Sequence, residues 1–125
     1  GVCEVSFAFT DGGDLVAVGR NEDGDRTGFG SQLFFAPKND LGSWKPLEVS
    51  LPQRFDSPRL VNVDGSLLLF ARFARESYAA VPTWLPFGLQ RFGNLLCYSL
   101  LPKAAAVYHL SPPLRDGTWR ERTLE

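Results

Sequence analysis

The sequence predicts an all-β fold, because apolar residues alternate along short runs and Asp-Gly turns separate several of those runs. Alternation with a period of two turns one side of a run toward the core, as in a half-buried strand. A chain of 125 residues ordinarily forms one domain. Strands are expected at 5–10, 14–20, 31–37, 43–51, 59–63, 66–72, 104–110 and 116–124.

Turn residues define the connections between these strands. Asp11-Gly12-Gly13 joins the first two, and Asp64-Gly65 joins the fifth and sixth, as is typical of hairpins. Pro46 favours an edge position for the fourth strand, since proline cannot donate a hydrogen bond to a neighbour. Helical periodicity is confined to residues 85–101.

The chain contains an internal repeat. FAFTDGGDLVAVGR and LVNVDGSLLLFAR share the order strand, Asp-Gly turn, apolar strand, arginine, with one extra residue in the first turn. Arg20 and Arg72 are therefore equivalent. LFFAPKNDLGSW and VYHLSPPLRDGTW also match, which pairs Trp44 with Trp119 and locates an insertion at 73–103.

The repeat predicts two four-stranded antiparallel units, residues 1–52 and 53–125, arranged as blades of a β-propeller. The alternative is one antiparallel sandwich of about eight strands. Because propellers close with about four to eight blades, two blades leave apolar sides uncovered. The chain is then either part of a longer propeller, which its lack of a starting methionine favours, or one of several copies in a ring.

Three segments resemble the sialidase-type β-propellers, and more closely a sialidase-like branch of that superfamily: CEVSFAFTDGGDLVAVGRNEDGDRTGFGS, FDSPRLV and LPFGLQRFGNLLCYSLLPKAAAVYHL. The resemblance spans nearly the whole chain, on moderately specific motifs. The Asp box of the superfamily, Ser-x-Asp-x-Gly-x-Thr-Trp, is present only in degraded form, at 40–44 and 115–119. The resemblance implies a structural role for Asp40, Trp44, Asp116 and Trp119.

Blade geometry selects the candidate binding residues, because the loop entering a blade and the loop after its second strand share one face. This ligand face carries Glu4, Arg20, Asn21, Glu22, Asp23, Asp56, Arg59 and Arg72. A guanidinium fork matches a carboxylate in bidentate geometry, so Arg20 and Arg72 are expected to bind substrate, together with Asn21, Asp23 and Arg59. The alternatives are a buried network of arginines and carboxylates between blades, and a solvated acidic turn at 21–25.

Glu4 and Asp56 are the candidate catalytic residues, since most glycosidases use a pair of carboxylates. The resemblance implies three arginines that clamp a substrate carboxylate, a Tyr–Glu nucleophile and an Asp acid/base. Neither a third arginine nor the tyrosine is assigned, because Tyr78, Tyr98 and Tyr108 match no catalytic motif of the family.

The insertion at 73–103 is rich in aromatic and leucine residues. Long loops are often lids, so Trp84 or Phe87 is a candidate for stacking on a sugar ring. The alternative is an insertion folded onto its own blade. Gln90, Arg91 and Asn94 interrupt the apolar stretch, so no membrane span is predicted.

Composition excludes other classes of function. A net charge of −1 gives no basic footprint for nucleic acid. Cys3 and Cys97 fit neither a metal spacing nor a CxxC motif, and DGDRTG lacks the spacing of a calcium loop, so neither metal nor cofactor is predicted. A single cysteine pair only slightly favours a secreted or extracytoplasmic location.

Three functions fit the sequence. The first is a sialidase-like propeller that recognises a glycan or another small carboxylate-bearing ligand, or processes a glycan as a glycoside hydrolase. The second is a carbohydrate-binding, lectin-like module without catalysis. The third is a scaffold subunit of a larger assembly.

Overall fold

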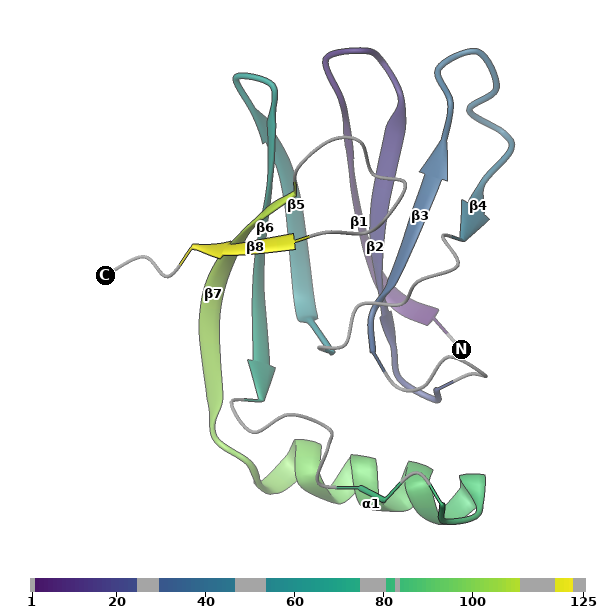
Figure 1. Ribbon diagram of the computed structural model, residues 1–125, viewed down its shortest axis with the longest axis vertical. Coiled ribbons are helices and arrows are strands. Elements are labelled where there is room, and N and C mark those ends of the chain that lie inside the picture. The colour runs from purple at the N-terminus through teal and green to yellow at the C-terminus, as the bar shows by residue number, and fades with distance from the viewer. Residues whose placement is uncertain are drawn as a thin grey trace.

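The computed structural model is mostly β, with two antiparallel sheets and one helix (Figure 1). Sheet one contains β1 (Val2–Phe9), β2 (Leu15–Asn21), β3 (Gln32–Ala36) and β4 (Lys45–Pro46). Sheet two contains β5 (Asp56–Val63), β6 (Ser66–Ala74), β7 (Lys103–Leu110) and β8 (Trp119–Arg122). Strands follow chain order within each sheet. The structure describes residues 2–24, 30–46, 54–74, 81–82, 84–110 and 119–122.

The predicted β-rich class and the helical insertion are confirmed. Each expected strand has a counterpart, although 43–51 and 116–124 lie partly outside the described residues. The helix α1 (Phe87–Leu100) occupies the insertion between β6 and β7. Asp116 and Tyr78 also lie outside the described residues.

The two sheets repeat the same strand register. Cys3 pairs with Arg20 in sheet one, and Asp56 pairs with Arg72 in sheet two. Both first strands are then irregular at the next position, where Glu4 has a φ of 52° and Ser57 a φ of 47°. The repeat in the sequence therefore corresponds to a repeat in backbone structure, including one bulge in each sheet.

The extra residue of the first hairpin is explained by its turn type. Thr10 and Asp14 close a three-residue turn, with Gly13 at a φ of 88°. The second hairpin has a two-residue turn, with φ of 48° at Asp64 and 80° at Gly65, as in a type I′ turn. The two hairpin tips are linked, because Asn62 donates a hydrogen bond to Asp11 at 2.8 Å.

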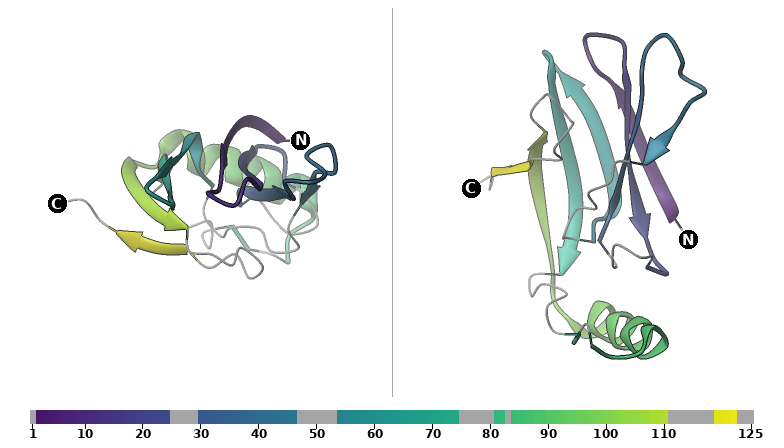
Figure 2. Two further views of the ribbon diagram at one scale, coloured as in Figure 1. Left: turned by 90° about the horizontal axis from the view of Figure 1, so that it is seen from above. Right: turned by 45° about the vertical axis from the view of Figure 1, so that its right-hand side comes forward.

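The core lies between the sheets, where β1 runs beside β5 (Figure 2). Sheet one contributes Val16, Val18 and Leu33, and sheet two contributes Leu60, Leu67, Leu69, Ala71 and Tyr108, joined by Phe55 just before β5. Polar contacts support this packing, since the Leu60 backbone donates to Ser6 at 2.9 Å and that of Phe55 to Ser31 at 2.8 Å.

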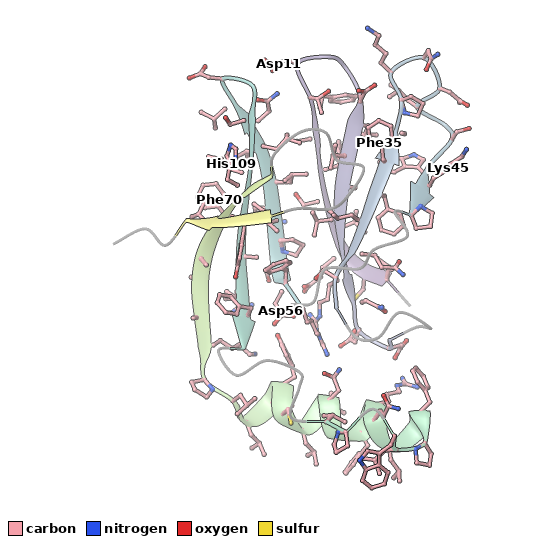
Figure 3. The ribbon with its side chains drawn as sticks, in the orientation of Figure 1. Asp11, Phe35, Lys45, Asp56, Phe70 and His109 are labelled. Carbon is pink, nitrogen blue, oxygen red and sulfur yellow. The ribbon has the colours of Figure 1, made fainter. Side chains whose placement is uncertain are left out.

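The helix α1 lies beyond one end of both sheets, the end that carries Asp56 (Figure 3). Its orientation is opposite to that of an ordinary surface helix, which buries an apolar stripe. The residue it buries is Asn94, whereas its exposed side carries Leu89, Phe92, Leu95, Leu96 and Leu100.

Candidate functional site

The charged cluster between the sheets and α1 is centred on Arg20, at the end of β2. Its side chain is 14% exposed and meets three carboxylates. Nη1 lies 3.1 Å from Glu4, Nη2 lies 3.0 Å from Glu22, and Nε lies 3.1 Å from Asp56. Asp56 belongs to sheet two and its side chain is fully buried, so this ion pair joins the two sheets.

Arg54 extends the cluster and was not among the residues selected from the sequence. Its side chain is buried, with Nε 3.8 Å from Asp56 and Nη2 3.9 Å from Glu22. It lies two residues before the start of β5, outside any periodic segment, so alternation gives no sign of it. Its one sequence signal is its closeness to Asp56, since a buried carboxylate needs a cation nearby.

Tyr98 brings α1 into the same cluster. Its ring lies 4.2 Å from the guanidinium carbon of Arg54, 5.3 Å from that of Arg20 and 4.0 Å from Nζ of Lys103. A cation near the face of an aromatic ring is attracted by the ring quadrupole, so Tyr98 connects α1 to the arginines of the cluster. Gln90, Asn94 and Tyr98 recur at the spacing of one helix face, and this polar spacing is the signal that indicates the inward side.

The protonation states of the cluster limit its chemistry. The hydrogen bond from the Ser57 backbone, followed by Arg20, holds the pKa of Glu4 below its usual range. Glu4 is therefore ionised at neutral pH and poorly suited to act as a general acid. Burial, together with the neighbouring Asp56 carboxylate, raises the pKa of Tyr98 to about 12, so its phenol is protonated.

Arg72 has the backbone position of Arg20 but different surroundings. It is exposed, and its Nη2 donates to the Ser57 hydroxyl at 3.2 Å. Arg59 is also exposed and contacts the Pro58 carbonyl at 3.4 Å. Within the described residues, neither arginine forms an ion pair with a carboxylate.

Arg59 and Arg72 border an open groove of about 540 Å³ on the outer side of sheet two. Its apolar surface comes from Phe70, on the outer side of the sheet in Figure 3, and from β7. The residues that line the groove are Ser57, Arg59, Phe70, Ala71, Arg72, Ala105, Ala106 and Val107.

The remaining candidates are dispersed. Asn21 is buried, and Asp23 forms an ion pair with Arg91 of α1. Trp84 is 80% exposed. The structure thus places some candidate residues in the charged cluster around Arg20, others at the open groove beside Arg72, and the rest at separate positions.

The described residues hold no group of three or more His, Cys, Asp or Glu side chains placed to bind a metal. Cys3 and Cys97 are both free thiols. Burial, followed by the hydrogen bond with Glu22, raises the pKa of the Cys3 thiol, so it is not an activated nucleophile. Over the same residues, no helix combines the length and hydropathy needed to cross a bilayer.

Comparison with protein-family models, with curated proteins and with solved structures gives no match. The resemblance to the sialidase-type propellers therefore depends on the sequence segments and degraded Asp boxes alone.

Proposed function

We propose that the chain forms two blades of a sialidase-like β-propeller that recognises a carboxylate-bearing glycan. The blade interpretation is supported by the order of the strands, which follows the chain in both sheets, and by the matching bulges at Glu4 and Ser57. It is supported further by the packing of β1 beside β5, since neighbouring blades pack face to face.

The observation that carries the proposed recognition is the groove beside Arg59 and Arg72. Neither guanidinium group pairs with a carboxylate among the described residues, so both are suited to bind a carboxylate of a ligand. The Ser57 hydroxyl offers a hydrogen bond to a sugar hydroxyl, and Phe70 offers an apolar surface to a sugar ring.

The charged cluster is poorly suited to hydrolysis of a glycan. The candidate pair Glu4 and Asp56 is engaged by Arg20, and Glu4 also accepts the Ser57 backbone N–H at 3.0 Å. The protonated phenol of Tyr98 is a weak nucleophile. Because Arg20 already meets three carboxylates, we assign it to the packing of the sheets and assign ligand binding to Arg72.

Binding of sialyllactose tests the proposal, with lactose as the matched ligand that lacks the carboxylate. We expect sialyllactose to bind more tightly. Arg72→Gln and Arg59→Gln should each weaken that binding about ten- to a hundredfold, because each removes a charge-assisted contact worth about 1.5–3 kcal/mol. Arg72→Lys should lie between, since it keeps the charge and loses the fork. Calorimetric titration measures these affinities.

Arg91→Gln is the control variant, since Arg91 is exposed, lies outside the groove and pairs with Asp23. It should bind sialyllactose as the unaltered chain does. Equal affinity for the two ligands would contradict carboxylate recognition, and so would an unchanged affinity in Arg72→Gln. Turnover of a fluorogenic sialoside would show that the protein hydrolyses the glycan and does not merely bind it.

A further inference from the structure

Equivalent positions of the two sheets differ sharply in exposure. Phe7 of β1 is 60% exposed, whereas its equivalent in β5, Leu60, is buried against sheet one. In the other direction, Phe70 of β6 is 41% exposed, whereas its equivalent in β2, Val18, is buried against sheet two. In both pairs the apolar residue is buried only where the other sheet covers it.

Each sheet therefore has one covered face and one apolar outer face. The outer face of sheet one carries Val5, Phe7 and Phe9, and the outer face of sheet two carries Val61, Val63 and Phe70, all of them exposed. Contiguous exposed apolar surface of this kind commonly marks an interaction site.

The two outer faces are complementary by the internal repeat. Within the chain, the inner face of sheet one packs on the inner face of sheet two. The strand registers make the outer face of sheet one equivalent to the inner face of sheet two. The same registers make the outer face of sheet two equivalent to the inner face of sheet one. We infer that the outer face of sheet one docks on the outer face of sheet two of a second copy of this chain.

The contact between the two sheets of one chain defines the geometry expected for the contact between two copies. Each copy would present two different faces, so the contact is heterologous, and it closes into a ring when the rotation between sheets fits. Because propellers close with about four to eight blades, a ring of two-sheet copies would contain about two to four of them.

The intermolecular contact would lack the hydrogen bonds of the internal one. Internally, Asn62 donates to the Phe9 carbonyl and to Asp11, and Ser6 accepts from Leu60. The residues equivalent to Asn62 and Ser6 are Phe9 and Arg59, which cannot make these contacts. Association should therefore depend mainly on burial of the apolar side chains that both outer faces expose.

This inference rests on the two-blade interpretation of the proposed function, and it shares Phe70 with the proposed glycan groove, so a second copy and a glycan would compete for that ring. A second copy docked on Phe70 would also roof the groove beside Arg72. Because sedimentation without a glycan reports self-association alone, association can fail while sialyllactose still binds, and the reverse also holds.

Two charge variants test the inference by sedimentation. Phe7→Asp disables the outer face of sheet one, and Phe70→Asp disables the outer face of sheet two. We expect the unaltered chain to form a defined oligomer and each variant alone to be monomeric. A mixture of the two variants should form a one-to-one dimer and nothing larger, because only one matching pair of faces remains.

Leu100→Asp is the control, since Leu100 is 79% exposed on α1 and belongs to neither outer face. It should associate as the unaltered chain does. Circular dichroism checks folding, and Val5→Asp and Val63→Asp are second variants on the same two faces. A monomeric unaltered chain, a mixture that stays monomeric, or loss of association in Leu100→Asp would each overturn the inference.

Discussion

Glu4 joins the bulge of sheet one to the bulge of sheet two, because its carboxylate accepts a hydrogen bond from the Ser57 backbone N–H at 3.0 Å. The same carboxylate contacts Arg20 at 3.1 Å. Two equivalent bulges therefore meet where the sheets pack, and Glu4 connects them to the buried ion pair beside them.

We expect Glu4 to make stability depend on acid pH. Its pKa is lowered, first by the Ser57 hydrogen bond and then by Arg20, from an ordinary value of 4.5. Such a carboxyl contributes stability above that ordinary value and loses the contribution as pH falls through the lower folded value. The melting temperature should therefore fall below pH 4.5, and Glu4→Gln should remove part of this dependence.

Thermal melts followed by circular dichroism from about pH 7 to about pH 3 measure this dependence. Asp40→Asn is the control, because Asp40 is exposed and forms no ion pair with a described residue. It should keep the pH profile of the unaltered chain. A Glu4→Gln profile parallel to that of the unaltered chain would argue against the assigned role of Glu4.

Arg20→Met should lower the free energy of unfolding by about 3–5 kcal/mol, since it leaves a buried carboxylate without its nearest cation. The Asp56 side chain is fully buried, and the next cation, Arg54, is 3.8 Å away. A double-mutant cycle of Arg20→Met with Asp56→Asn should give a coupling of about 0.5–3 kcal/mol, measured by urea denaturation.

Arg72→Met is the matched comparison, because Arg72 has the same strand position in the second sheet and is exposed. Its loss should change the free energy of unfolding by less than about 1 kcal/mol. Equal losses for Arg20→Met and Arg72→Met would contradict the assignment of Arg20 to sheet packing.

This contrast also shows how far the sequence predicts the site. Alternation, turns and the repeat predict the strands and place Arg20 and Arg72 at equivalent positions, as the structure has them. They do not predict the surroundings of the two arginines, because Asp56 reaches Arg20 from the other sheet across a tertiary contact. Arg20 is therefore enclosed, while Arg72 remains open to a ligand.

Gly65→Ala should lower the free energy of unfolding by about 1–2 kcal/mol, the cost of the left-handed region for a residue with a side chain. Gly65 has a φ of 80°, and an added Cβ would lie 2.7 Å from a carboxylate oxygen of Asp11. Gly12→Ala is the control, since its Cβ would meet ordinary contacts, and its effect should stay within about 0.5 kcal/mol. Urea denaturation compares the two, and equal effects would contradict the assigned turn types.

The orientation of α1 determines which substitutions in the helix are costly. The usual rule for an amphipathic helix places its leucines against the protein, whereas here Phe92 and Leu100 face outward and Tyr98 faces the sheets. Phe92→Gln and Leu100→Gln should therefore change the free energy of unfolding by no more than about 0.5 kcal/mol. Tyr98→Ala should lower the free energy of unfolding by about 2 kcal/mol or more, because Arg20, Arg54 and Lys103 lose their contacts with the aromatic ring.

Urea denaturation of the three variants decides between the two orientations. Tyr98→Phe is the conservative control, since it keeps the aromatic ring over the cations and removes only the hydroxyl, so it should retain most of the stability that Tyr98→Ala loses. If the leucine side were buried instead, Phe92→Gln and Leu100→Gln would be the costly changes and Tyr98→Ala the mild one. The packing of the helix on the charged cluster would then be wrong, because a ring that faces solvent cannot also cover Arg54, whose side chain is buried beneath it.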